Sequence, residues 1–130
     1  MPMPETPIGQ GPLVSVVIPA FRQAGFIEET LQSVFGQTYG NLEAIVVDDA
    51  SPDDTAAVMA RFDDPRLIYI RHDTNRGLPE SRNTGMRAAR GELIAWLDAD
   101  DVYHPEKLEA HVAFLQSHPE VGFTYSARFE

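Results

Sequence analysis

Short apolar runs rich in β-branched residues alternate along this chain with longer segments whose apolar residues recur every three or four positions. The runs predict strands that are covered on both faces, and the segments between them predict amphipathic helices. The expected strands are 13–19, 43–48, 66–71, 92–97 and 121–125. The expected helices are 26–37, 51–62, 78–90 and 105–117. The first has one apolar stripe, expected to be buried, made of Phe26, Ile27, Leu31, Val34 and Phe35.

Residues at the helix ends agree with this division. Ser51 suits an N-cap, Pro52 suits the first helical position, and Asp54 can complete a pair of the capping-box type. Pro79 stands in the first turn of the third helix, and Gly91 follows its last turn. These residues predict ends for the second and third helices at the positions where the hydrophobic pattern changes.

A chain in which each strand is followed by one helix folds with parallel strands and right-handed helical crossovers. We therefore expect the α/β class, as a Rossmann-like, doubly wound and mostly parallel sheet. Sheets of this kind bind their ligands at the carboxyl ends of the strands, near the switch point in strand order.

Polar and aromatic residues stand at these strand ends. Pro19 and Phe21 follow the first strand, Asp48 and Asp49 the second, and Asp98, Asp100 and Asp101 the fourth. Because the carboxyl ends of parallel strands meet at one edge of a sheet, five carboxylates and an aromatic ring are expected on one rim.

The acidic cluster after the fourth strand indicates a cation. Three like charges within four residues repel one another, and a divalent ion relieves this repulsion. Mg²⁺ and Mn²⁺ prefer oxygen ligands and are often shared between carboxylates and a phosphate group. The alternative is a solvated acidic turn. On the first interpretation Asp100 or Asp101 holds the ion against a diphosphate, and a carboxylate of the 98–101 group accepts from a ribose diol.

The other candidates suit a nucleotide. Phe21 offers a flat face for a base, unless it is a core residue at a strand end. Asp49 can accept a hydrogen bond from a base N–H, whereas Asp48 is expected to brace the loop or cap the next helix. Arg82 could reach the diphosphate or the base, or be a solvated helix charge. His72 and His104 are weaker candidates for ligands, because a lone His is more often a surface or capping residue.

Length, composition and net charge narrow the classes of protein to which this chain can belong. The 130 residues suffice for one domain, and the Pro- and Gly-rich 1–12 segment is expected to be a flexible lead-in rather than a signal peptide. A net charge of −10 argues against a nucleic-acid partner. There is no cysteine, and no apolar run reaches the length of a membrane span. We expect a cytoplasmic domain, with peripheral membrane association of a parent protein left open.

With these residues in view, the chain resembles the N-terminal half of family 2 glycosyltransferases, which use nucleotide-diphosphate sugars on a GT-A-type fold. The similarity extends over about 13–125, and its longest block is the most specific. The matching segments are VSVVIPAF (14–21), SVFGQTY (33–39), VVDDAS (46–51) and NRGLPESRNTGMRAARGELIAWLDADD (75–101).

The resemblance implies roles for several residues. Phe21, next to Pro19, would line the base pocket, and Asp49 would contact uracil. Asp98, Asp100 and Asp101 would hold ribose and the Mn²⁺ or Mg²⁺ that bridges the diphosphate. Arg82 matches a basic position that lies near the nucleotide.

The same resemblance implies a UDP-sugar as donor and a saccharide or lipid-linked acceptor, with an inverting transfer. Family members place their general base in the C-terminal half of the domain, so it is expected beyond Glu130. Residues 13–130 would then be the donor-binding half of a truncated GT-A-type domain. It would bind nucleotide weakly without turning over, and the surface exposed by truncation could support a homo-oligomer.

Two other classes stay open. The run from Leu97 to Val102 also fits the strand-then-DxDx pattern of haloacid-dehalogenase-like phosphatases, with Asp98 as nucleophile. That family carries the motif on its first strand and a Lys downstream, whereas Lys107 is the only lysine here. A non-catalytic module that binds a metal and a nucleotide, or another protein, is the third possibility.

Overall fold

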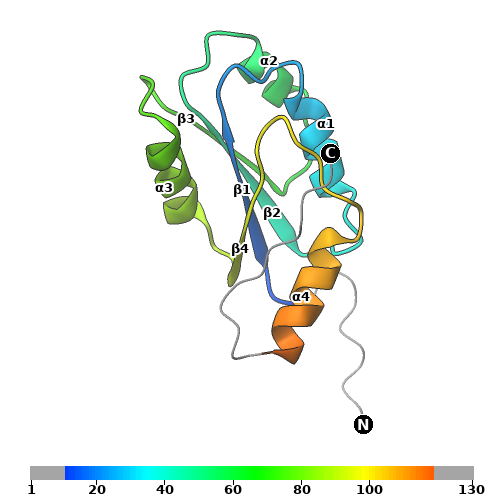
Figure 1. The fold of residues 1–130 in the computed structure, drawn as a ribbon. Coiled ribbons are helices and arrows are strands. Elements are labelled where there is room, and N and C mark those ends of the chain that lie inside the picture. Colours follow the sequence, from blue (N-terminus) through cyan, green and yellow to red (C-terminus); the bar gives the residue numbers. More distant parts are fainter. Residues whose placement is uncertain (1–10, 119–130) are drawn as a thin grey trace.

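The computed structural model describes residues 11–118 and contains one parallel four-stranded sheet with the strand order β3-β2-β1-β4 (Figure 1). The strands are β1 (Val14–Ala20), β2 (Leu42–Asp48), β3 (Leu67–Arg71) and β4 (Leu93–Trp96). The helices are α1 (Ile27–Phe35), α2 (Thr55–Ala60), α3 (Leu78–Ala88) and α4 (Lys107–Ser117). This confirms the α/β class and the parallel sheet. The strand expected at 121–125 lies outside the described residues.

The sheet has helices on both faces. Figure 1 shows α3 on one side of the sheet and α1 and α2 on the other. Alternate residues of β1, Val14, Val16 and Ile18, belong to the main apolar core. Helix α1 adds Ile27 and Leu31 to this core, as the helical period of the sequence predicts. The core also draws on α2 and on α4, through Val58, Met59, Leu108 and Val112.

On the opposite face α3 approaches β1 closely. Gly85 is buried, and a Cβ atom at this position would lie 2.3 Å from Cγ1 of Val17. No side chain larger than hydrogen fits at this distance, so Gly85 sets how near the helix lies to the sheet. This contact holds α3 closely against β1.

A buried carboxylate fixes the other end of α3. Glu43, in the middle of the sheet, is 2% exposed. It accepts hydrogen bonds from the Ser15 hydroxyl at 2.6 Å and from the Arg90 backbone N–H at 2.8 Å. Burial raises the pKa of Glu43, but these bonds and the Arg90 guanidinium outweigh it and leave the pKa below its usual value. The Glu43 anion is tolerated in this strand because both of its carboxylate oxygens accept hydrogen bonds.

Some predicted element ends need correction. Helix α2 begins at Thr55 and has no side-chain cap, because the Ser51 hydroxyl bonds to the neighbouring loop and to Asp53 instead. Helix α4 begins at Lys107 rather than 105. Phe26, expected on the buried stripe of α1, is 57% exposed. No helix between residues 11 and 118 is long and apolar enough to cross a membrane.

Candidate functional site

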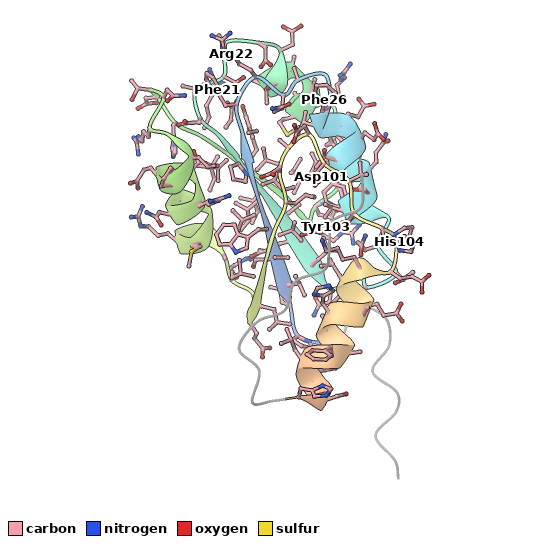
Figure 2. All side chains as sticks on the ribbon, in the orientation of Figure 1. Phe21, Arg22, Phe26, Asp101, Tyr103 and His104 are labelled. Carbon is pink, nitrogen blue, oxygen red and sulfur yellow. The ribbon has the colours of Figure 1, made fainter. Side chains whose placement is uncertain are left out.

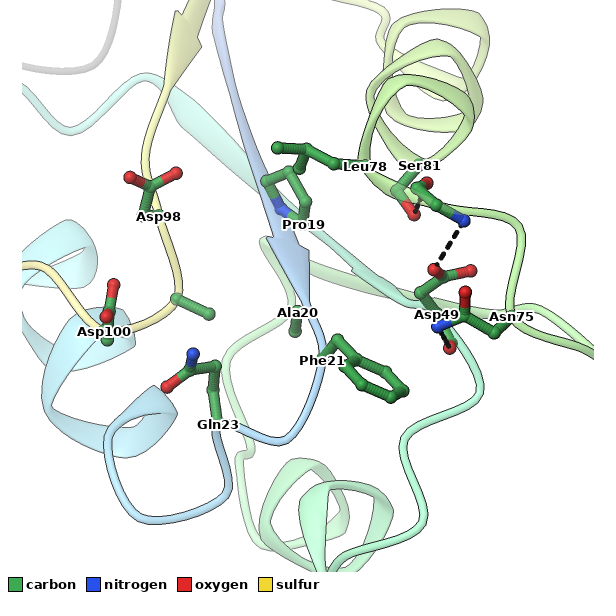
Figure 3. A pocket seen from close by; sticks show the side chains of 12 residues that line it. Pro19, Ala20, Phe21, Gln23, Asp49, Asn75, Leu78, Ser81, Asp98 and Asp100 are labelled. Carbon is green, nitrogen blue, oxygen red and sulfur yellow. Dashed lines mark hydrogen bonds between the residues drawn. The ribbon is translucent and has the colours of Figure 1, made fainter.

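A cavity of about 560 Å³ opens at the carboxyl ends of the strands (Figure 3). Five of the seven predicted site residues line it: Pro19, Phe21, Asp49, Asp98 and Asp100. Asp49 and Asn75 lie at one end in Figure 3, and Asp98 and Asp100 at the other. Pro19 and Ala20 lie between the two ends, and the ring of Phe21 lies beside them on the Asp49 side. The cavity therefore presents an aromatic ring and an acidic group at one end and two further acids at the other.

Asp49 is held rigidly at its end of the pocket. It is 4% exposed, and Oδ1 accepts hydrogen bonds from Nδ1 of His72 and from the Arg76 backbone N–H, both at 2.8 Å. Oδ2 accepts from the Gly77 backbone N–H at 2.9 Å. Burial raises the pKa of Asp49, and these three donors more than reverse it, so that the pKa lies below its usual value. Asp49 is an oriented carboxylate anion at neutral pH.

The neighbouring acid points elsewhere. Asp48 is fully buried, and its carboxylate accepts from the Ser51 backbone N–H at 2.8 Å and from the Arg71 guanidinium at 2.6 Å. The Tyr69 hydroxyl is its third donor. Asp48 does not line the pocket. The expectation that it braces the loop is confirmed, while a bond capping α2 is not formed.

The aromatic ring comes from the loop after β1. Phe21 is 38% exposed, which contradicts a core role, and the Arg22 guanidinium lies over its ring at 5.3 Å (Figure 2). Arg22 has a φ of 59°, a left-handed conformation that non-glycine residues rarely adopt. Its backbone N–H donates to the Ser51 hydroxyl at 2.8 Å. This bond ties the strained loop that presents Phe21 to the end of β2.

Asp53 completes this connection. Its Oδ1 accepts from the Ser51 hydroxyl at 2.6 Å, and its Oδ2 accepts from the Ala24 backbone N–H at 3.1 Å. Burial pushes the pKa of Asp53 upward, but the bonds from Ser51, Thr55 and Ala24 bring it down to about 2. One carboxylate thus joins the loops that follow β1 and β2.

At the other end, the backbone of the acidic loop is fixed while its side chains are exposed. The buried Thr30 hydroxyl of α1 lies 3.0 Å from the Ala99 carbonyl and 2.6 Å from the Asp101 carbonyl. Asp98 and Asp100 are exposed, and no donor within residues 11–118 bonds to either carboxylate. The loop is therefore ordered by its main chain, and two pocket carboxylates point toward solvent.

Two predicted residues lie outside the pocket lining. The Asp101 carboxylate accepts from the Val102 backbone N–H at 2.9 Å. Arg82, on α3, places its guanidinium 5.9 Å from the centre of the Trp96 ring on β4. Figure 2 shows Asp101 in the loop that leads to Tyr103. Burial raises the pKa of Tyr103, and the charges of Asp101 and Asp98 raise it further.

The donor set fits a shared cation rather than a closed metal site. Within residues 11–118 there is no group of three or more His, Cys, Asp or Glu side chains that could hold an ion alone. Asp98 and Asp100 offer hard oxygen ligands in an open pocket. Mg²⁺ and Mn²⁺ are commonly bound in this way, by one or two carboxylates together with the phosphates of a substrate.

The sequence did not single out several residues of the pocket wall: Gln23, Asn75, Gly77, Leu78 and Ser81. Asn75 and Gly77 follow β3, as the strand-end rule anticipates, and Asn75 Nδ2 donates to the Asp49 carbonyl at 3.3 Å. His72 is not a surface residue but a buried partner of Asp49. His104 lies outside the pocket lining, and its Nδ1 accepts from the Glu106 backbone N–H at 3.3 Å.

Comparison with known proteins decides the family. The model of glycosyl transferase family 2 matches residues 15–129. The chain belongs to this family. The match covers the four segments that carried the resemblance except Val14, and it removes the basis for the phosphatase alternative.

Two bacterial glycosyltransferases are among the relatives of this chain. It is 36% identical over 114 residues to WfaP of Escherichia coli, named a UDP-Glc:alpha-D-GlcNAc-diphosphoundecaprenol beta-1,3-glucosyltransferase, covering 88% of this chain and 45% of WfaP. It is 35% identical over 106 residues to TuaG of Bacillus subtilis, a putative teichuronic acid biosynthesis glycosyltransferase, covering 80% of this chain and 42% of TuaG. The chain spans less than half the length of these relatives.

Solved glycosyltransferases share the fold. The UDP complex of Staphylococcus aureus TarS superposes with a TM-score of 0.77 at 31% identity, over 82% of this chain and 32% of the TarS chain. The mannosyltransferase PcManGT of Pyrobaculum calidifontis, in complex with GDP-Man and Mn²⁺, gives a TM-score of 0.75 at 33% identity, over 80% of this chain and 32% of its own. Both likenesses place this chain in the GT-A-type class.

Proposed function

We propose that this chain is the donor-binding part of a glycosyltransferase that transfers a sugar from a nucleotide diphosphate sugar to an acceptor hydroxyl. The observation that carries the proposal is the pocket itself. An oriented anion, Asp49, and an exposed ring, Phe21, lie at one end, and the carboxylates of Asp98 and Asp100 at the other. This order suits a nucleotide diphosphate, whose base would meet the first two groups and whose ribose and diphosphate would meet the other two.

In the proposed complex the base stacks on Phe21 beside Pro19, and Asp49 accepts a base N–H. Asp98 accepts from the ribose hydroxyls. The complexes of TarS with UDP and with UDP-GlcNAc favour a uridine nucleotide, although the GDP-Man complex of PcManGT keeps guanine as the second candidate. Arg82 reaches the nucleotide only if its side chain leaves the Trp96 ring.

Asp100 would hold a Mn²⁺ or Mg²⁺ ion, and Asp101 could join it after turning away from Val102. When bound, such an ion would stabilise the negative charge that develops on the departing diphosphate. The acceptor oxygen bonds to the anomeric carbon as the sugar–phosphate bond breaks, which inverts the configuration. The base that removes the acceptor proton belongs to a part of the protein outside these 130 residues.

The partners of the whole protein are proposed on the same basis. A saccharide or lipid-linked acceptor agrees with the diphosphoundecaprenol acceptor in the name of WfaP. A cytoplasmic location suits a nucleotide-sugar donor. Ile94 and Trp96 on β4 are exposed together, so self-association through this face is part of the proposal.

Calorimetric titration of the 130-residue chain with UDP, with and without MnCl₂, tests the donor proposal. We expect measurable binding that strengthens at least tenfold with Mn²⁺. Asp100→Asn should remove the metal dependence, whereas Asp63→Asn, an exposed acid after α2, should not. Absence of binding to both UDP and GDP would favour a non-catalytic interaction module instead.

A further inference from the structure

His72 connects the base end of the pocket to α3. The ring is 4% exposed, and it lies directly after β3. Its Nδ1 is 2.8 Å from Oδ1 of Asp49, and its Nε2 is 2.8 Å from the hydroxyl oxygen of Thr84 on α3. A buried imidazole that forms hydrogen bonds through both nitrogens is held in one orientation. The side chains bonded to it are restricted in turn.

The protons of this chain of contacts follow from its ends. The Asp49 carboxylate accepts hydrogen bonds only, so Nδ1 carries the proton that it donates to Oδ1. In the neutral ring Nε2 then accepts from the Thr84 hydroxyl. The same ring therefore links the carboxylate that follows β2 to α3.

The carboxylate has one acceptor position left. Two ionised oxygens provide about four acceptor positions. His72 and Arg76 use those of Oδ1, and Gly77 uses one of Oδ2. The fourth belongs to Oδ2, and Asp49 lines the cavity.

We propose that His72 is a positioning residue: by bridging Asp49 and Thr84 it fixes the free acceptor position of Asp49 for a ring N–H of the donor's base. The inference rests on the proposed function and deepens it. An anion with a fixed acceptor position selects bases that carry a ring N–H beside a carbonyl, as uracil and guanine do. Cytosine and adenine present a ring acceptor at the corresponding place and leave the carboxylate unpaired.

The test compares nucleotides that differ only in this N–H. The full 130-residue chain is titrated in MnCl₂ with UDP and GDP, and then with the N3-methyl derivative of UDP or the N1-methyl derivative of GDP, whichever parent binds. In the wild-type chain the methyl group should weaken binding at least tenfold. Substitution of His72 should then weaken the parent nucleotide and leave the methylated one unchanged.

Three variants grade the effect. His72→Phe removes both bonds and should weaken the parent nucleotide about tenfold. His72→Asn keeps an N–H close to the position of Nδ1, so its affinity for the parent nucleotide should stay within about threefold of wild type. Thr84→Val removes the hydrogen bond to Nε2 and should weaken that affinity about threefold. His104→Phe, outside the pocket, is the matched control. Urea unfolding followed by Trp96 fluorescence identifies variants that are folded, and Thr84→Val carries the test if His72→Phe is not.

The outcomes separate the inference from the function. Equal weakening of parent and methylated nucleotides would overturn the positioning role and leave His72 as a structural residue. Undiminished binding in folded His72→Phe would overturn it as well, with donor binding intact. If the wild-type chain binds neither UDP nor GDP, the proposed function falls and the inference falls with it.

Discussion

The acids that follow β2 and those that follow β4 are built in opposite ways. Asp48 and Asp49 are buried, and each accepts three hydrogen bonds from the protein. Asp98 and Asp100 are exposed and accept none from residues 11–118, although the Thr30 hydroxyl fixes the main chain of their loop.

The difference shows which charges belong to the fold. A buried carboxylate with three donors stabilises the native state, and its removal leaves those donors without a partner. An exposed carboxylate with no donor contributes little to stability and retains its capacity for a ligand. The first pair should therefore be sensitive in unfolding experiments, and the second pair in binding experiments.

The largest effect on stability is expected for Asp48→Asn. The amide keeps the size of the side chain but removes the charge that Arg71 and the Tyr69 hydroxyl face in a fully buried position. We expect the free energy of unfolding in urea to fall by about 2–3 kcal/mol. Asp63→Asn is the control and should change it by less than about 0.5 kcal/mol. Equal effects of the two substitutions would contradict the contribution of the buried Asp48 carboxylate to the fold.

A smaller loss is expected for Asp53→Asn. Because the folded-state pKa of Asp53 is lowered to about 2, its contribution is present above the unfolded-state pKa near 3.8 and disappears as the pH falls toward 2. We expect the variant to lose about 1 kcal/mol at pH 7, since the side chain is partly exposed and its interactions are screened.

Urea unfolding of both proteins at several pH values checks this prediction. The difference between wild type and Asp53→Asn should be constant from pH 7 to about 5 and then shrink between pH 4 and 2. A difference that stays constant down to pH 2 would exclude the charge of Asp53 as its cause.

A substitution in the same loop should stabilise. Ala50 has a φ of 60°, a left-handed conformation that costs an L-residue energy and costs glycine almost none. We expect Ala50→Gly to raise the free energy of unfolding by about 0.5–1 kcal/mol, after subtraction of the larger chain entropy of glycine. Ala57→Gly, at an exposed position of α2, is the opposite control and should destabilise by a similar amount. A loss in both variants would mean that the strain at Ala50 is relieved by its surroundings.

The hydrophobic pattern predicted the fold well because the strands are buried and parallel. The run 43–48 became β2 almost residue for residue, and Leu31 and Val34 were placed in the core by helical period alone. The strand-end rule then located Phe21 and Asp49 in the pocket, because it depends on topology and on no side-chain detail.

Side-chain direction was beyond the same reasoning. Arg82 lies on the right helix but stacks on Trp96, because the sequence does not say which partner an exposed guanidinium meets. Asp101 follows the right strand, yet its carboxylate accepts a hydrogen bond from the Val102 backbone N–H and does not line the pocket. His72 was a lone histidine with several interpretations, and only the fold brings it to Asp49 and Thr84.

The smallest expected effect on stability sharpens the comparison most. Replacing both Asp98 and Asp100 by Asn removes two like charges from one exposed loop, so the free energy of unfolding should stay the same or rise, by no more than about 0.5 kcal/mol. The main chain of the loop keeps its bonds to Thr30 in this variant. In urea, added Mn²⁺ should leave the unfolding midpoint of the double variant unchanged. The wild-type chain with UDP and Mn²⁺ should be stabilised, because binding favours the folded state by mass action. A double variant that unfolds as readily as Asp48→Asn would show that these two acids belong to the fold after all.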